Sequence, residues 1–352
     1  MSLTLPKKVL KENPFYILLI FALFAFIAQF AGWNAKVIFT LSALGIIPLA
    51  QVIGEATEDL AAYVGPRLGG LINATLGNAA ELIITIFAVA RGLTTLVKAS
   101  ITGSILGNLL LVLGFSMLAG GIKNGTQKFD RRHVSTSAII AVLAVISLGI
   151  PSMTKDHFAS PHRIEILSIG VAAVMLVLYA LFLLFSHQNS PIQPEAHSEP
   201  KHSLKSDVIV LTLATITVAV LSEMLVGTVE EVVSEFGISE FFIGIILIPI
   251  IGNVAEHLVA VQQALRNSMD LSVEIAVASS IQIAMFVAPL LVFIGLLLGH
   301  PLTLVFQPLE IMALASAVIT MALVSMDGES NWLEGAELLA VYLILAIAFF
   351  LM

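Results

Sequence analysis

Eleven apolar stretches, each about as long as a membrane span, run through this 352-residue chain. A membrane-spanning helix needs about 20 apolar residues. The composition agrees, because 58% of the residues are hydrophobic and only 11% are charged, whereas ordinary soluble domains carry about 25% charged residues. Such a chain has too little polar surface to cover a soluble globule. We therefore expect an all-α polytopic membrane protein with eleven transmembrane helices.

Charged or Gly/Pro-rich breaks separate the expected spans. They lie near residues 15–32, 36–54, 71–91, 99–120, 134–152, 164–185, 207–226, 240–264, 272–298, 308–325 and 333–352. The second span is expected to continue into a short polar helix through EATEDLAAYVG. The first span could mimic a signal peptide, but it is long for one and no clear cleavage site follows it. We interpret it as a retained span.

The basic residues of the short loops predict the orientation of the chain. With the N-terminus inside, eleven of the 16 Lys and Arg residues fall in inside segments and five in outside segments. The inside group comprises Lys7, Lys8, Lys11, Arg67, Lys123, Lys128, Arg131, Arg132, Lys201, Lys205 and Arg266, and the outside group comprises Lys36, Arg91, Lys98, Lys155 and Arg163. We expect an integral protein of the cell (plasma) membrane with a cytoplasmic N-terminus and an extracytoplasmic C-terminus.

The longest polar break is SHQNSPIQPEAHSEPKHSLKSD, residues 186–207. It is rich in Pro, Ser, Glu and His, which is typical of a flexible linker. It is either a solvated tether or a weak cation-sensing segment that uses Glu195, Glu199, His187, His197 and His202. The expected organisation is an N-terminal transmembrane helix (1–34), a first five-helix repeat (35–185), a cytoplasmic linker (186–206) and a second five-helix repeat (207–352).

The two halves share short motifs. GNAAELII at residues 77–84 returns as GNVAEHLV at 252–259, 175 residues later. TGSILGN (102–108) aligns with ASSIQIA (278–284), and TEDLA (57–61) aligns with SEMLV (222–226). The second half carries an extra polar stretch, residues 227–236, expected to form a surface helix. Because each half has an odd number of spans, the halves must enter the membrane from opposite faces, as in the inverted repeats of secondary transporters.

Each copy of the GN motif places a carboxylate, Glu81 or Glu256, inside an apolar span. A charge at the bilayer centre costs about 3 kcal/mol on insertion scales. Each acid could simply pair with a local Ser, Asn or His, but their relation through the repeat favours a shared function. Gly77, Gly252 and the nearby Pro249 are expected to loosen the helices at this depth. The freed backbone carbonyls could then coordinate a cation.

The candidate ligands are all oxygen donors. Asn78 and Glu81, like Asn253 and Glu256, are three residues apart and would share a helix face. The fourth and ninth spans add further polar side chains, which serve as ligands or supporting groups or else only pack the helices through GxxxG contacts: Ser104, Asn108, Ser279, Ser280 and Gln282. Oxygen ligands indicate Ca²⁺ more readily than Zn²⁺ or Cu²⁺. No other cofactor is expected.

Protons should use the same two acids. Two close carboxylates in a low dielectric cannot both stay charged without a cation, so the empty site should take up protons and release them when Ca²⁺ binds. His257, beside Glu256, either takes part in proton transfer or only donates a hydrogen bond. Glu58 and Glu223 form a second matched pair, which either passes protons and cations at cavity mouths or caps helices. Other acids at span ends are expected to lie at the interface: Asp270, Glu274, Glu310, Asp327, Glu329 and Glu334.

With these motifs the sequence resembles the cation/proton exchanger (CAX) family of Ca²⁺/H⁺ antiporters, within the calcium/cation antiporter superfamily. The resemblance covers nearly the whole chain, including GPRLGGLINATLGNAAELI, ASITGSILGNLLLVLG, FFIGIILIPIIGNVAEH, EIAVASSIQIAMFVAP and DGESNWLEGAELLAVY. It implies eleven spans, extrusion of cytosolic Ca²⁺ driven by the proton gradient, and Glu81 and Glu256 as the key acids. Many members carry a strongly acidic helix between the sixth and seventh spans, whereas this linker has only Glu195 and Glu199 before Asp207.

The sequence gives less support to other classes of function. An intramembrane metalloprotease would need H-E-x-x-H, and AEHLV lacks the first His. No P-loop motif indicates an ATP-driven pump, and no Cys is present for a disulfide or a thiolate metal site. The net charge of -8 argues mildly against nucleic acid as a partner. Na⁺/Ca²⁺ exchange, Mn²⁺/H⁺ exchange, a passive channel and a homo-oligomeric state are left open.

Overall fold

The computed structural model describes residues 14–158, 160–189 and 202–352 and is almost entirely helical. Most of the 186–206 linker and the three Lys residues near the N-terminus lie outside the described residues. The chain forms two compact units, which are residues 1–87, 196–238 and 251–255, and residues 88–195, 239–250 and 256–352. The units interleave along the chain and do not coincide with the predicted repeats, whose boundaries remain a prediction.

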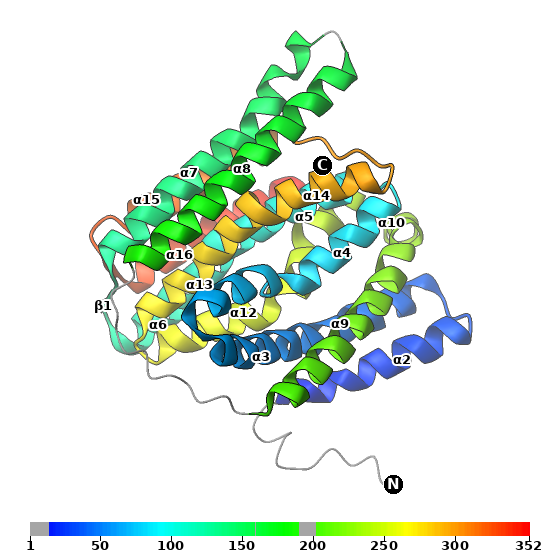
Figure 1. Ribbon diagram of the computed structural model, residues 1–352, viewed down its shortest axis with the longest axis horizontal. Helices are drawn as coiled ribbons and strands as arrows, with labels where there is room; N and C mark the ends of the chain where they lie inside the picture. Colours follow the sequence, from blue (N-terminus) through cyan, green and yellow to red (C-terminus); the bar gives the residue numbers. More distant parts are fainter. Residues whose placement is uncertain (1–13, 159, 190–201) are drawn as a thin grey trace. The chain divides into compact units, whose positions relative to one another are not determined.

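The first unit is built around one long helix, α3 (Ala35–Leu76). Its other elements are η1 (Pro14–Leu18), α2 (Leu19–Phe30), α9 (Leu204–Gly227) and α10 (Val229–Phe236), with parts of α4 (Ala79–Ala90) and α12 (Ile248–Leu265). Helices α2 and α9 pack along α3 (Figure 1). The surface helix expected at 227–236 is confirmed as α10, and an ion pair of 3.0 Å between Lys36 Nζ and Glu235 Oε2 joins it to the start of α3.

Helix α3 is longer than any predicted element. Its 42 residues measure about 63 Å at 1.5 Å per residue, about twice the hydrocarbon thickness of a bilayer. The predicted extension of the second span through EATEDLAAYVG is therefore confirmed, since Ala, Leu and Glu are strong helix formers. The helix then continues to Leu76 and takes in the start of the predicted third span, so that only the 12 residues of α4 follow the turn at Gly77 and Asn78.

The second unit contains the remaining helices. They are α5 (Thr94–Leu106), η2 (Gly107–Val112), α6 (Leu113–Asn124), α7 (Arg131–Thr154), η3 (Lys155–His157), α8 (Pro161–Asn189), α11 (Glu240–Phe242), η4 (Ile243–Leu247), α13 (Met269–Gln282), η5 (Ile283–Val287), α14 (Ala288–Leu297), α15 (Pro308–Val324) and α16 (Trp332–Phe350). Helices α7 and α8 form a hairpin (Figure 1). Two-residue strands β1 (Gln127–Lys128) and β2 (Glu329–Ser330) pair antiparallel. Among the described elements these two strands are the exception to an all-α fold.

By length and composition, eight described helical segments can cross a membrane, and three shorter apolar helices accompany them. The short ones are Tyr16–Phe30, Ala79–Ala90 and Pro308–Val324. All eleven coincide with the predicted stretches, which confirms a polytopic helical membrane protein. Because three of them fall below the length of a full span, the count of eleven remains a prediction.

Three π-helical segments interrupt the spans: η2, η4 and η5. Segments η2 and η5 begin at Gly107 and Ile283, the same offset that aligns TGSILGN with ASSIQIA, so the repeat extends to backbone geometry. Segment η4 ends at Leu247, two residues before Pro249, which stands in the first turn of α12. Pro has no backbone N–H to donate and its ring clashes with the preceding turn, so its place just after a π turn agrees with an irregular helix at this point. Single π turns of this kind are frequent at functional sites.

Several acids at span ends serve helix termini. Glu310 accepts a hydrogen bond from the backbone N–H of Gln307 at 2.7 Å and closes a capping box at the start of α15. Glu334 does the same for Asn331 at the start of α16, at 3.0 Å. Asp270 accepts from the backbone N–H of Asp130, and Glu329 pairs with Lys128 at 3.2 Å. The contacts of Glu310, Glu334 and Asp270 satisfy backbone N–H groups that a helix or loop would otherwise leave open.

Candidate functional site: two polar clusters at the repeated motifs

The first cluster lies where α3 gives way to α4. Gly77 and Asn78 form a turn, and the backbone N–H of Leu82 donates to the Asn78 carbonyl at 2.9 Å as α4 begins. Glu81 stands in the first turn of α4 and is fully buried, and Asn78 is 2% exposed. The prediction that Gly-Asn opens the helix is confirmed here. The turn places a carboxylate at a helix N-terminus, where the helix dipole favours negative charge.

Asn253 from the second motif contacts this acid directly. Its Nδ2 donates to Glu81 Oε2 at 3.1 Å, and both side chains belong to the first unit. Gly252 permits the approach, since a Cβ at this position would lie 3.3 Å from Glu81 Cβ. The two GN motifs, separated by more than 170 residues in sequence, therefore meet through one amide and one carboxylate.

The second motif differs from the first in its backbone. Gly252 and Asn253 lie inside α12, which continues without a break from Ile248 to Leu265. The prediction that Gly252 opens its helix is therefore wrong. The glycine packs closely against Glu81, where a Cβ would make a tight contact, and the irregular backbone lies in η4, upstream of Pro249.

The second cluster links three side chains of the second unit. Asn108 Nδ2 donates to Ser279 Oγ at 3.0 Å, and Asn108 Oδ1 lies 3.1 Å from His257 Nε2. Asn108 comes from η2, Ser279 from α13 and His257 from α12. Since an amide oxygen only accepts hydrogen bonds, His257 Nε2 carries the proton in this contact and Nδ1 is the nitrogen left to exchange one. Asn108 is 2% exposed and Ser279 is 5% exposed, so the Asn108 amide and the Ser279 hydroxyl are both buried.

The other predicted ligands are Ser104, Ser280, Gln282 and Glu256. Ser104 and Ser280 are buried, and Ser280 Oγ donates back to the Ala276 carbonyl of its own helix at 2.9 Å. Gln282 and Glu256 are partly exposed members of the second unit. On α12 Glu256 follows Asn253 by three residues, which is close to one helical turn.

Glu58 and Glu223 are the second matched pair of acids predicted from the repeat. Each has an exposed side chain inside a helix, Glu58 in α3 and Glu223 in α9. The N-caps of these helices are Asn34 and Ser203, so the alternative that the two acids cap helices is wrong. Their use as waypoints for protons or cations stays a prediction.

Sequence reasoning missed two buried polar contacts near the clusters. Thr85 Oγ1 donates to the Glu81 carbonyl at 2.9 Å, which holds the first turn of α4 around the acid. Thr102 Oγ1 donates to Glu310 Oε1 at 2.9 Å. The sequence does indicate that Glu310 caps a helix, because it follows Gln307 by three residues, the spacing of a capping box. Nothing in the sequence pairs Thr102 with an acid 208 residues away.

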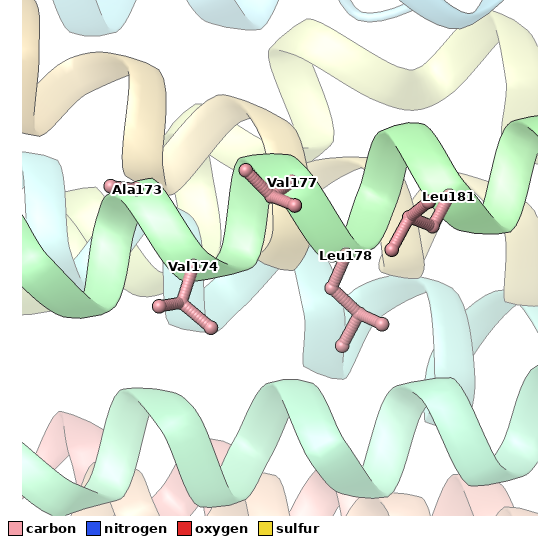
Figure 2. Close-up of a pocket in the computed structure, with 5 residues that line it drawn as sticks. All are labelled: Ala173, Val174, Val177, Leu178 and Leu181. Carbon is pink, nitrogen blue, oxygen red and sulfur yellow. The ribbon is translucent and has the colours of Figure 1, made fainter.

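An apolar groove along α8 has no ion-binding chemistry. It is lined by Ala173, Val174, Val177, Leu178 and Leu181, all from α8, and Figure 2 shows only carbon in these side chains. Val174 and Val177 are 65% and 61% exposed. In a membrane-spanning helix, such a face suits contact with lipid chains. The carboxylates and amides of the two clusters are the better candidates for binding a cation.

Helical spans, interrupted helices and a buried carboxylate–amide contact at repeated motifs are typical of membrane transport proteins. Comparison with known proteins gives the family. The chain matches the family of the sodium/calcium exchanger protein over residues 34–188 and 206–351, and it belongs to that family.

Individual relatives match along almost their full length. The chain is 46% identical to the Ca²⁺/H⁺ antiporter ChaA of Bacillus subtilis (strain 168), over 93% of this chain and 95% of that one. It is 42% identical to a Ca²⁺/H⁺ antiporter of Aphanothece halophytica, over 97% of each. Its fold matches the structure of native YfkE with a TM-score of 0.86 and 43% identity, covering 96% of this chain and 100% of that chain.

Proposed function

We propose that this protein is a secondary active Ca²⁺/H⁺ antiporter of the cell membrane that extrudes cytosolic Ca²⁺ in exchange for protons. The family and the near full-length relatives named as Ca²⁺/H⁺ antiporters support this activity. Its proposed orientation has a cytoplasmic N-terminus and an extracytoplasmic C-terminus, as the distribution of basic residues indicates.

The contact between Asn253 and Glu81 carries the proposal for the site. It joins the second motif to the acid of the first at 3.1 Å. Glu256 follows Asn253 by three residues on α12, a rise of about 4.5 Å. We therefore assign Glu81 and Glu256 jointly to the transported Ca²⁺. We further assign the oxygens of Asn78, Asn253, Asn108, Ser104, Ser279, Ser280 and Gln282 and the backbone at Gly77 and Gly252 as the remaining ligands or as groups that orient them.

Competition between Ca²⁺ and protons for these acids couples the two fluxes. Buried carboxylates without a cation are stabilised by protonation, and a divalent ion that binds them displaces the protons. Alternating access then carries Ca²⁺ in one direction and protons in the other. His257 contributes through Nδ1, because its Nε2 is engaged by Asn108.

Flux into proteoliposomes tests the proposed activity. We expect Ca²⁺ to enter vesicles with an acidic interior, at a rate that does not change when Na⁺ is added. Collapse of the pH gradient with an ionophore should reduce initial uptake to the rate of protein-free vesicles. Uptake that continues unchanged after the collapse would indicate a channel, and uptake that follows a Na⁺ gradient would indicate Na⁺/Ca²⁺ exchange. Replacing Ca²⁺ with Mn²⁺ in the same assay compares the two cations.

A further inference from the structure

A second group of metal-ligating side chains lies in the first unit, apart from the proposed transport residues. It consists of Asp59 on α3, His202 just before α9, and Asp207 in the first turn of α9. One ligand atom from each residue lies within 4.8 Å of the other two. His202 Nδ1 is 2.8 Å from Asp59 Oδ2 and 3.8 Å from Asp207 Oδ1.

The backbone around His202 is held in place. Tyr63 Oη donates a hydrogen bond to the His202 carbonyl, and Ser203 Oγ accepts one from the backbone N–H of Ser206 at 3.3 Å as the N-cap of α9. Asp59 and Tyr63 are four residues apart on α3 and so share one helix face. The side chain and the backbone of His202 are therefore fixed against the same face of α3.

The carboxylate of Asp207 is the observation that points to a ligand. Asp207 is 3% exposed, and its Oδ2 has no hydrogen-bond partner in the described part of the chain. A buried carboxylate normally finds a partner or a cation. Within the described residues the ion-pair partner of both Asp59 and Asp207 is His202, so at most one positive charge faces two negative ones. A divalent ion would neutralise both carboxylates.

We propose that Asp59, His202 and Asp207 bind a divalent transition-metal ion of the Zn²⁺ type. An imidazole nitrogen suits Zn²⁺, Mn²⁺ and their neighbours, whereas Ca²⁺ prefers sites made entirely of oxygen. Three protein ligands leave a coordination position for water. The imidazole is 65% exposed, so the ion can reach the site from solvent. Binding would join the start of α9 to α3, the helix that leads directly into the turn before Glu81.

Zn²⁺ titration of the full-length protein in detergent micelles tests the proposal. Calorimetry is carried out in saturating Ca²⁺, so that the transport acids are occupied. We expect wild type to bind one more Zn²⁺ per chain than His202→Gln, or to bind it at least about tenfold more tightly, since loss even of groups that only support a ligand costs about 10- to 100-fold in affinity. Asp207→Asn, which keeps the size of the side chain, should show the same loss.

The matched control is His162→Gln. His162 Nδ1 lies 3.7 Å from Glu165 Oε2, and within the described part of the chain this is its one acidic partner. This variant should bind Zn²⁺ like wild type. Equal stoichiometry and affinity in wild type and His202→Gln would overturn the proposal, as would a loss of the same size in His162→Gln. Circular dichroism of His202→Gln and Asp207→Asn checks that both variants keep the helical fold.

Discussion

Replacing Glu81 with glutamine should lower Ca²⁺/H⁺ exchange by at least about 100-fold while the protein stays folded. Unit charges about 4 Å apart interact by about 4 kcal/mol at an effective dielectric constant of about 20, and about 2.8 kcal/mol already corresponds to 100-fold. Glutamine keeps the shape of the side chain and an oxygen for the Asn253 amide, which donates at 3.1 Å. The variant therefore removes the charge and the proton-binding group but retains the packing. Initial Ca²⁺ uptake into proteoliposomes with an acidic interior is the measurement.

The partner acid and a surface acid complete this experiment. Glu256→Gln should cause a loss of similar size, because one Ca²⁺ is assigned to both carboxylates. Glu230→Gln on the exposed face of α10 should transport like wild type. Near-normal exchange in either Glu81→Gln or Glu256→Gln would remove that residue from the proposed site.

Replacing Gly103 with alanine should destabilise the protein by at least about 3 kcal/mol, at the upper end of what overpacking costs in a core. Gly103 in α5 packs against η4, and a Cβ at this position would lie 1.9 Å from the carbonyl oxygen of Ile245. Backbone cannot yield as a side chain can, so α5 and η4 would have to separate. Gly244 in η4 makes the reciprocal approach, since its Cβ would lie 2.7 Å from the Leu96 carbonyl oxygen.

Gly107→Ala is the control from the same GxxxG pair. A Cβ at Gly107 would meet no heavy atom within 4 Å, so alanine should leave stability unchanged or raise it by about 0.4–1 kcal/mol through a less flexible unfolded chain. Thermal unfolding of both purified variants in the same detergent compares them. Equal unfolding midpoints for Gly103→Ala and Gly107→Ala would contradict the close packing of α5 on η4.

The sequence predicted the helices of this fold well because apolar length alone marks a span. It predicted that the second span continues through the polar stretch EATEDLAAYVG, but it could not show that α3 would run on to Leu76, because helix ends depend on local competition between turn and helix at Gly77 and Asn78. It also could not separate π from α geometry, since both bury the same kind of apolar run. The Gly-Asn pair illustrates the difficulty, because it forms a turn in the first motif and a tight helix contact in the second.

The candidate site was predictable where the repeat marked it. Equal spacing selected Asn78, Glu81 and Asn253, and the structure brings Asn253 to Glu81. The polar side chains expected on the fourth and ninth spans include Asn108 and Ser279, which the structure joins by a hydrogen bond. The partner of His257 was not predictable, because it depends on how η2 packs. Likewise, Asp59 and His202 are 143 residues apart in sequence, and only the packing of α9 on α3 brings them together.

Proton release on Ca²⁺ binding tests most directly whether the two ions compete for the same carboxylates. When Ca²⁺ is added to the purified protein in weakly buffered solution, we expect the medium to acidify, because cation binding displaces protons from Glu81 and Glu256. The affinity for Ca²⁺ should also fall as the pH is lowered, and both effects should be lost in Glu81→Gln. Ca²⁺ binding by wild type with an affinity independent of pH and without proton release would contradict the account.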